Sequence, residues 1–420
     1  MTITQPDLSV FTALESEVRS YCRTWPTVFD RAHGSRIYDE DGHEYLDFFA
    51  GAGALNYGHN NPVLKRALLD YLERDGVTHA LDMSTKAKRA FLERFQDTIL
   101  RPRELPYKVM FPGPTGTNAV EAALKLARKV TGRQTVISFT NAFHGMSLGS
   151  LAVTGNSFKR SGAGVPLVHT TAMPFDGYAN GKGPDLTWLE QQLQDSGSGL
   201  DQPAAVIVET IQGEGGINVA RTAWLQELAR LCQRHGMLLI VDDIQMGCGR
   251  TGGFFSFEEA GITPDIVTLS KAISGYGLPL SLCLFRPELD VWEPGEHNGT
   301  FRGNNPAFVT ATAALNTYWV DDHLRKQTLA QGMIVEAALR DIAAHHSGSA
   351  YRGRGMAWGL ELSDSHHAGR AALRAFELGL LIETSGSCSQ VLKVLPALTI
   401  ASDELDLGLR LIARAVDETA

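Results

Sequence analysis

The stretch Met237-Leu-Leu-Ile-Val-Asp-Asp-Ile-Gln245 joins an apolar run to two aspartates, and Asp265-Ile-Val-Thr-Leu-Ser-Lys271 joins a second apolar run to a lysine. Short, continuous apolar runs of this kind are typical of strands that are buried on both faces of a parallel sheet. The carboxyl ends of such strands meet at one edge of the sheet, where ligands bind. We therefore expect Asp242 and Lys271 to lie near each other at that edge.

An acid and an amine in this arrangement suit a pyridine-aldehyde cofactor. Lys271 would form a Schiff base with the aldehyde, and Asp242 would lie against the ring nitrogen and keep it protonated, so that the ring withdraws electrons. The alternative is that Asp242 caps a turn and Lys271 is solvated at a helix start, as most lone charged residues are. The flanking sequence favours the cofactor site.

Composition excludes several classes of protein. The chain has 420 residues, of which 44% are hydrophobic and 20% charged, as is ordinary for a globular enzyme with a large and a small domain. A net charge of -9, with no basic block and no zinc-ligand spacing to offset it, argues against nucleic acid as a partner. We also expect no metal site. No apolar stretch is long enough for a membrane span, and the polar start lacks an export signal. Five scattered cysteines without a paired spacing indicate reduced thiols, so we expect a cytoplasmic protein.

The pattern of hydrophobic residues changes along the chain. A helical start at 11–23 precedes two short strands at 35–39 and 43–48, and the Asp41-Gly42 pair between them predicts a hairpin turn. Apolar strands then alternate with amphipathic helices, which indicates a mostly parallel sheet covered on both faces. The expected strands are 108–111, 135–139, 204–208, 237–241, 266–269 and 280–285, with helices at 65–74, 118–130 and 222–235.

The last third of the chain is mainly helical, with helices expected at 307–318, 322–345 and 403–418 and a strand at 356–362. We expect both terminal parts to pack together beside the large domain. The predicted division is residues 1–62 and 307–420 for the small α+β domain and residues 63–306 for the large cofactor-binding domain.

Several loops after the predicted strands carry polar or glycine-rich sequences. Gly113-Pro-Thr-Gly-Thr-Asn118 leads into a helix, whose free N–H groups, with a hydroxyl from Thr115 or Thr117, would hold a phosphate; a plain helix cap is the alternative. In Asn141-Ala-Phe-His-Gly-Met146, Phe143 would either stack on a cofactor ring or belong to the core, and His144 would lie near the cofactor edge. Glu209-Thr-Ile-Gln-Gly-Glu-Gly-Gly216 would form a polar site wall, or a glycine turn with solvated acids.

Together these segments resemble the class III, or omega, aminotransferases of fold type I, which use pyridoxal 5'-phosphate. The resemblance runs in order through Gly-Thr-Asn-Ala-Val-Glu121, Phe-His-Gly145, Glu-Thr-Ile-Gln-Gly-Glu-Gly-Gly216, Asp-Asp-Ile-Gln-Met-Gly-Cys-Gly-Arg-Thr-Gly252, Ser-Lys-Ala-Ile-Ser274 and Gly-Thr-Phe-Arg-Gly-Asn304. It implies an α/β fold whose large domain holds a seven-stranded, mostly parallel sheet between helices.

The resemblance also implies a role for each site residue. Lys271 would be the Schiff-base lysine and proton carrier, and Asp242 the partner of the ring nitrogen. The remaining cofactor contacts would come from Gln245 on the phenolic oxygen, Phe143 on one ring face, His144 and Glu209 at the cofactor edge, and Gly116, Thr117 and Thr300 of the partner subunit on the phosphate. A site shared in this way implies an obligate homodimer or a higher homo-oligomer.

The same resemblance also implies how the substrates would be bound. Arg352 would bind the alpha-carboxylate of glutamate or 2-oxoglutarate, and Glu214 would neutralise that arginine when a terminal amine enters. Many members of the family have an arginine where this chain has Met146, so another cation is needed for the distal end of the substrate. Arg160 and Arg302 are the candidates.

The implied activity is a ping-pong transamination between an amino acid and a 2-oxo acid. Segments such as 47–59 and 78–83 resemble one subgroup, which exchanges the 4-amino group of L-2,4-diaminobutyrate with 2-oxoglutarate at the start of ectoine synthesis. The alternatives are an omega-aminotransferase acting on ornithine, acetylornithine or 4-aminobutyrate, an aminomutase, and a regulatory or binding module without catalysis.

Overall fold

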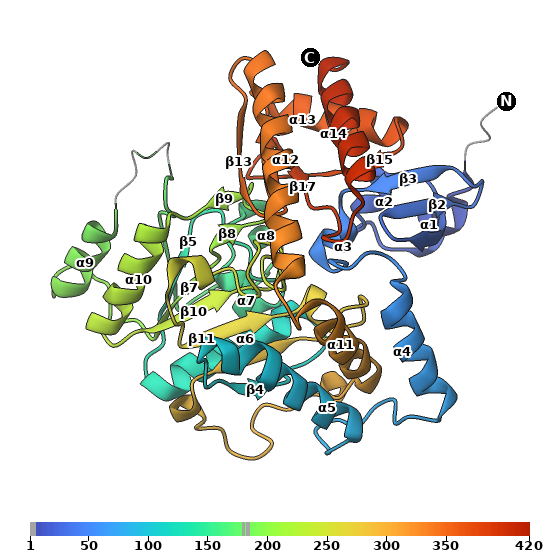
Figure 1. The fold of residues 1–420 in the computed structure, drawn as a ribbon. Helices are drawn as coiled ribbons and strands as arrows, with labels where there is room; N and C mark the ends of the chain where they lie inside the picture. Colours follow the sequence, from blue (N-terminus) through green and yellow to red (C-terminus); the bar gives the residue numbers. More distant parts are fainter. Residues whose placement is uncertain (1–5, 179–180, 182–184) are drawn as a thin grey trace.

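A central sheet of seven strands forms the core of the computed structural model, which describes residues 6–178, 181 and 185–420 (Figure 1). In sheet order the strands are β4 (Lys108–Met110), β12 (Leu282–Phe285), β11 (Ile266–Leu269), β10 (Leu238–Asp242), β7 (Ala205–Val208), β5 (Val136–Phe139) and β6 (Thr170–Met173). Only β12 runs antiparallel to its neighbours. The predicted α/β fold with a mostly parallel seven-stranded sheet is confirmed.

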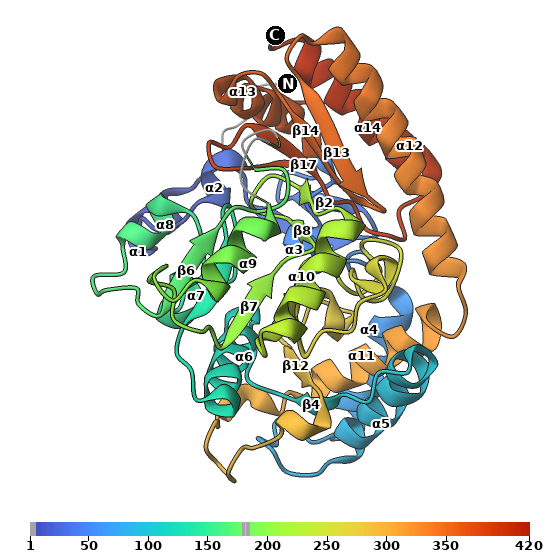
Figure 2. The same cartoon turned by 90° about the vertical axis from the view of Figure 1, so that its left-hand side faces the viewer.

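Alternate residues of the strands face opposite sides of this sheet. Leu238 and Ile240 of β10 belong to a core cluster with the apolar face of α6 (Gly116–Thr131). Leu239 and Val241 belong to the larger cluster, which includes residues of α10 (Thr222–Arg234) and α11 (Asn305–Tyr318). Helices therefore cover both faces, as Figures 1 and 2 show, and Asp242 at the end of β10 continues the α6 side.

The N-terminal hairpin is confirmed. β2 (Arg36–Asp39) pairs antiparallel with β3 (Glu44–Asp47), and Gly42 at the turn has a φ of 84°. β1 (Phe29–His33) extends this sheet on one side, and β15 (Leu380–Leu381) pairs parallel with β3 on the other. Segments from the two ends of the chain thus lie side by side, which supports the proposed small domain.

A third sheet has the order β13 (Ala350–Arg354), β14 (Ala357–Glu361), β17 (Val391–Val394) and β16 (Glu383–Ser385), and β8 (Ile211–Gln212) pairs with β9 (Asn218–Val219). The long helix α12 (His323–His345) crosses from the large sheet to the C-terminal region, where α13 (Ser365–Glu377) and α14 (Ser402–Asp417) pack (Figure 2). The other helices are α1 (Ser9–Leu14), α2 (Tyr21–Thr24), α3 (Ala50–Gly53), α4 (Pro62–Glu73), α5 (Lys86–Phe95), α7 (Leu148–Ala152), α8 (Ser157–Ser161) and α9 (Leu186–Gln194), with short turns η1 (Gln96–Leu100), η2 (Arg101–Arg103), η3 (Glu258–Ala260), η4 (Lys271–Ser274), η5 (Pro287–Leu289) and η6 (Thr300–Arg302).

Two local predictions differ from the structure. The helix expected at 11–23 is broken into α1 and α2, and α1 has no buried residue that would hold a longer helix in place. The strand β6 was not predicted, because it lies at the sheet edge and begins with polar Thr170 and Thr171 instead of an apolar run. Among the residues that the structure describes, no helix combines the length and apolar character that a membrane crossing requires.

A buried guanidinium connects the large sheet to both terminal parts. Arg250 donates to the carbonyl oxygens of Met356 (3.1 Å) and Pro396 (2.5 Å) and to Oδ1 of Asn56 (2.6 Å). Burial lowers the pKa of Arg250 to about 9, although the charge of Asp47 opposes this shift. The hydrogen bonds fix the loop after β10 against segments that are distant in sequence.

Candidate active site

A cavity of about 320 Å³ opens at the carboxyl ends of the parallel strands. Lys271 lies two residues after the end of β11, Asp242 ends β10, and Glu209 directly follows β7. The structure brings together most of the predicted site residues, because the cavity is lined by Gly116, Thr117, Phe143, His144, Glu209, Glu214, Asp242, Gln245 and Lys271. The sequence analysis predicted the site at this sheet edge, because the carboxyl ends of parallel strands lie together there.

Lys271 presents a buried amine in this cavity. Its backbone is in the left-handed region, with a φ of 53°, which is rare for a residue with a side chain and is common at active sites. Its Nζ donates a hydrogen bond to the carbonyl oxygen of Ala52 at 2.9 Å. Burial lowers the pKa of Lys271, although the charge of Glu214 opposes the shift. A larger neutral fraction makes this amine a better nucleophile and proton acceptor.

Asp242 is held by three donors. Its Oδ2 lies 2.7 Å from Nδ1 of His144, and its Oδ1 accepts from the N–H of Ile244 and the hydroxyl of Thr268, both at 3.2 Å. Burial would lower the pKa of His144, but the hydrogen bond and charge of Asp242 outweigh burial and raise the pKa. The three donors fix the Asp242 carboxyl group in a buried position at the cavity wall.

The glycine-rich turn before α6 is both a helix cap and part of the cavity wall. Thr115 is the N-cap, and its hydroxyl and N–H both donate to Oδ1 of Asn118. Thr117 in the first turn shares hydrogen bonds with the hydroxyls of Ser147 (2.8 Å) and Ser150 (2.6 Å). Because the first N–H groups of a helix lack partners inside the helix, this end of the cavity suits a phosphate.

Phe143 and Glu209 form another side of the cavity. The N–H of Phe143 donates to Oε1 of Glu209 at 2.9 Å, and the ammonium of Lys159 lies 4.3 Å from the centroid of the Phe143 ring. Burial raises the pKa of Glu209 to about 7; His144 lowers it, and the charge of Asp242 raises it further. The protonation state of Glu209 therefore changes near neutral pH.

Glu214 has a partner that the sequence analysis missed. Its Oε1 accepts from Nζ of Lys393 at 2.6 Å and from Nε2 of Gln245 at 3.2 Å, and Lys393 also pairs with Glu383 at 2.8 Å. Burial would raise the pKa of Glu214, but Lys393 and Lys271 lower it to about 2. The signal for Lys393 was a single lysine inside the apolar run of β17, Val391-Leu-Lys-Val394.

The structure does not pair Arg352 with Glu214. Arg352 donates from Nε to the carbonyl oxygen of Gly216 at 2.9 Å and forms an ion pair with Glu361, and it does not line the cavity. Its place in β13, opposite Gly359 of β14, brings its guanidinium to Glu361 on the neighbouring strand. The buried cation beside Glu214 is Lys393.

Three other predicted residues lie outside the cavity. Arg160 donates from Nη1 to the carbonyl oxygens of Leu151, Ala152 and Thr154 at 2.9 to 3.1 Å, and Arg302 donates to His297 and Asn298. Neither arginine lines the cavity. Thr300 is exposed on η6, and its contribution to the site of a partner subunit stays a prediction.

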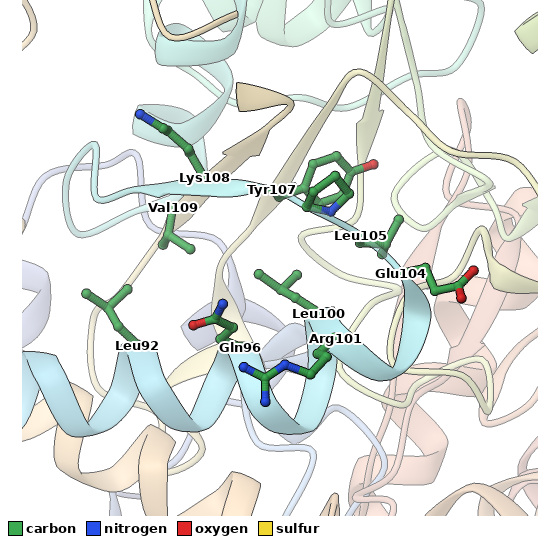
Figure 3. A pocket seen from close by; sticks show the side chains of 10 residues that line it. Leu92, Gln96, Leu100, Arg101, Glu104, Leu105, Tyr107, Lys108 and Val109 are labelled. Carbon is green, nitrogen blue, oxygen red and sulfur yellow. The ribbon is translucent and has the colours of Figure 1, made fainter. Parts of the chain in front are cut away.

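A larger hollow of about 730 Å³ lies between α5, η1 and the edge strand β4 (Figure 3). Leu92, Leu100 and Val109 are among its lining side chains, and none of the predicted site residues belongs to it. The smaller cavity therefore remains the candidate site, because it holds the buried acid, the buried amine and the helix N-terminus.

The cavity fits pyridoxal 5'-phosphate. Two polar atoms at its wall, Nε2 of His144 and Oε1 of Gln245, are buried without a hydrogen-bond partner among the described residues, and a bound molecule would satisfy them. The start of α6 provides a phosphate site, Asp242 provides an anion for a protonated ring nitrogen, and Lys271 provides an amine.

Comparisons with known proteins agree with this geometry. The family described as Aminotransferase class-III matches residues 19–416. A diaminobutyrate–2-oxoglutarate transaminase of Streptomyces avermitilis is 76% identical to this chain, and the match covers 100% of both chains. A transaminase of the same name from Halalkalibacterium halodurans is 56% identical over 99% of this chain and 97% of its own.

A solved structure shows the same fold. The ornithine aminotransferase of Toxoplasma gondii, described with partial occupancy of PLP at its active site, has a TM-score of 0.84 and 28% identity, covering 98% of this chain and 94% of its own. The sequence match covers the same segments that suggested the cofactor site. The chain belongs to the class-III aminotransferase family.

Proposed function

We propose that this chain is a pyridoxal-phosphate aminotransferase that exchanges the 4-amino group of L-2,4-diaminobutyrate with 2-oxoglutarate. The products are L-aspartate 4-semialdehyde and L-glutamate. The observation that carries the proposal is the buried pair of Asp242 and Lys271 in one cavity with the N-terminus of α6. The names of the relatives at 76% and 56% identity support the choice of substrate.

Six described residues would hold the cofactor. Gly116 and Thr117 would bind its phosphate, Phe143 would cover one ring face and Gln245 would bind the phenolic oxygen. Asp242 would keep the ring nitrogen protonated, and Lys271 would bind the aldehyde carbon. When bound, the cofactor supplies an electron-withdrawing ring and carries the amino group between the two substrates.

Lys271 is proposed as the proton carrier. Its Nζ lies at the cavity wall, and the lowered pKa prepares it to accept the proton from the substrate carbon that bears the transferred nitrogen. The resulting ammonium would donate this proton to the cofactor carbon that takes up the nitrogen, and the other half-reaction would run the same proton transfer in reverse. Glu209 and His144 lie next to Asp242. Their charges, together with that of Asp242, would determine the electrostatic environment of the ring nitrogen during this step.

Glu214 and Lys393 would adapt the cavity to two kinds of substrate. Glu214 faces an incoming amine while it covers Lys393, and its displacement would expose the Lys393 ammonium to the alpha-carboxylate of glutamate. We propose Lys393 for the role that the sequence resemblance assigned to Arg352.

The proposed assembly is a homodimer in which Thr300 of the partner subunit completes the phosphate site. We also propose a cytoplasmic location, since all five cysteines are free. A role in ectoine synthesis stays a prediction, which the genes beside this one would test.

Half-reactions followed by cofactor absorbance test the proposal. The protein should convert the cofactor to its amine form with diaminobutyrate and with glutamate, and much more slowly with ornithine, acetylornithine or 4-aminobutyrate. Faster conversion with one of those amines would replace diaminobutyrate as the substrate, turnover without an oxo acid would indicate an aminomutase, and no conversion with any donor would indicate a binding module.

The Lys271→Ala variant tests the residue that carries the reaction. We expect turnover to fall by a factor of about 10³ or more, because both the nucleophile and the proton carrier are removed. Lys326→Ala, which removes a surface lysine paired with Asp322, is the matched control and should keep full activity. Normal turnover of Lys271→Ala would contradict the assignment.

A further inference from the structure

A second, smaller cavity adjoins the cofactor cavity. It has a volume of about 160 Å³ and shares Phe143 and Glu214 with the first cavity. Its other polar lining residues are Asn141, Asn156, Ser157, Lys159 and Ser387. The two cavities thus meet at Phe143 and Glu214, and the second is a polar compartment that the proposed cofactor contacts leave unassigned.

Lys159 is the cation of this compartment. It lies on the short helix α8, whose N-cap Asn156 accepts a hydrogen bond from the Lys159 N–H at 3.1 Å. Its ammonium lies over the ring of Phe143, and within residues 6–178, 181 and 185–420 it forms no ion pair or hydrogen bond. A half-buried ammonium that is held only by an aromatic face is ready to bind an anion.

The other cations near the site are already engaged. Lys393 is held by two glutamates, Arg160 by three carbonyl oxygens, and Arg352 by Glu361 and the carbonyl oxygen of Gly216. Met146, at the position where many relatives would place an arginine, is exposed and uncharged. Among the cations that the structure describes around the two cavities, Lys159 therefore remains for the far end of a substrate.

The two proposed substrates need one such cation at the same distance. In diaminobutyrate, the carbon that bears the transferred amine lies three bonds from the carboxylate carbon. In glutamate, the carbon that bears the transferred amine also lies three bonds from the distal carboxylate carbon. A single cation in the second cavity would serve both half-reactions, whereas the alpha-carboxylate of glutamate requires a second cation nearer to Lys271.

We infer that Lys159 binds the distal carboxylate of both substrates, in a compartment formed by Phe143, Asn141, Asn156 and Ser387. The inference rests on the proposed function for the identity of the substrates. The amide and hydroxyl groups donate additional hydrogen bonds to the carboxylate, and Phe143 separates the reacting carbon from the bound anion.

Lys159→Met tests the inference, because methionine keeps an unbranched side chain of similar length and removes the charge. For diaminobutyrate, we expect kcat/KM of the half-reaction to fall about 10- to 100-fold, as for the loss of a charge-assisted hydrogen bond. For 1,3-diaminopropane, which lacks the carboxylate, the native protein and the variant should react alike. Lys159→Arg should restore most of the loss, and the surface variant Lys326→Met should be unchanged.

A purely structural role predicts a different result. If Lys159 only holds the ring of Phe143 in place, the methionine variant loses the same factor with diaminopropane as with diaminobutyrate, and the inference is overturned. Glutarate, a dicarboxylate without an amine or ketone, gives a readout that is independent of catalysis. Its dissociation constant, measured by calorimetry on the holoprotein, should rise about 10-fold or more in Lys159→Met, and an unchanged constant also overturns the inference.

Failure of the proposed function gives a distinct pattern. If the native protein reacts with glutamate but not with diaminobutyrate, the proposed amino donor is wrong. The role of Lys159 is then decided by comparing the native protein with Lys159→Met in the glutamate half-reaction and in glutarate binding. If both substrates react and Lys159→Met retains native constants for both and for glutarate, the proposed function stands and the role of Lys159 does not.

Discussion

The surroundings of two glutamates in the cavity shift their pKa values in opposite directions. Glu209 is buried beside Asp242, so its pKa is raised to about 7, whereas Glu214 lies between Lys393 and Lys271, so its pKa is lowered to about 2 in spite of burial. Similar side chains thus differ in charge at neutral pH because of their neighbours. Only Glu209 is expected to titrate in the range where enzymes are usually assayed.

The first prediction concerns this titration. Below pH 7 Glu209 is protonated and neutral; above pH 7 its negative charge adds to that of Asp242 and favours a protonated cofactor ring. We therefore expect the half-reaction rate to rise with pH through an inflection near 7, and Glu209→Gln to lose this inflection and to keep the lower rate. Rapid-mixing absorbance between pH 5.5 and 8.5 measures it. A Gln variant with the same inflection would assign it to another group, such as Asp243, whose pKa burial also raises to about 7.

The sequence predicted the residues that strand ends bring together. Asp242, Lys271 and Glu209 follow apolar runs, and the parallel sheet places those ends at one edge, so their meeting could be inferred without coordinates. The partner of Glu214 could not, because Lys393 reaches it from a different sheet and no spacing along the chain relates the two. The same reason explains why the sequence analysis placed Arg352, and not Lys393, beside Glu214.

At the scale of elements, the strand β17 brings a charge into the core. Every residue of Val391–Val394 is buried, and Lys393 is compensated there by Glu214 and Glu383. Taking one partner out of a buried ion pair leaves uncompensated charge, which costs more than the intact pair contributes. The stability of this sheet therefore depends on the complete triad.

Lys393→Met should lower the free energy of unfolding by about 3–5 kcal/mol at pH 8. The two glutamates then lose the cation that lowers their pKa values, so burial raises their pKa values above those of the unfolded chain. A raised carboxyl pKa gives a stability that falls as pH rises, so the deficit should shrink on acidification towards pH 5. Thermal denaturation at both pH values measures this change, with Lys393→Arg as the control that keeps the charge. A deficit independent of pH would indicate lost packing alone.

Elements with a strong hydrophobic period were predicted well. The helices α6, α10, α12 and α14 and six strands of the central sheet lie close to their predicted ranges. The missed elements have different causes. β6 is an edge strand that begins with polar residues and is held by β5, so its local signal is weak. The helices α5 and α13 each bury one face, which in α13 is formed by Ala368, Ala371, Ala372 and Ala375, so both carried a helical period that the sequence analysis missed.

At the scale of the whole molecule, the main prediction is that each site is shared between two subunits. Thr300 lies on an exposed turn outside the cavity of its own chain, as a residue that serves a neighbouring site would. Loss of its hydroxyl should weaken cofactor binding, and loss of Lys271 should abolish turnover. Subunits with one defect each therefore provide a test.

A mixture of Lys271→Ala and Thr300→Ala subunits, unfolded and refolded together, should regain activity at low cofactor concentration. One of the two sites in each mixed dimer would have both residues intact, so about a quarter of all sites should be active when subunits pair at random. Each variant refolded alone is the control. Activity equal to the mean of the two controls would show that Thr300 serves its own chain or no site at all.

The parallel pairing of β3 with β15 affects how the protein is made. During translation Glu44–Asp47 leave the ribosome long before Leu380–Leu381, so one edge of the N-terminal hairpin stays unpaired until synthesis is almost complete. An unpaired strand edge invites association with other chains. Nascent chains should therefore depend on chaperones, and a chain that stops before Leu380 should aggregate, however complete its central sheet is.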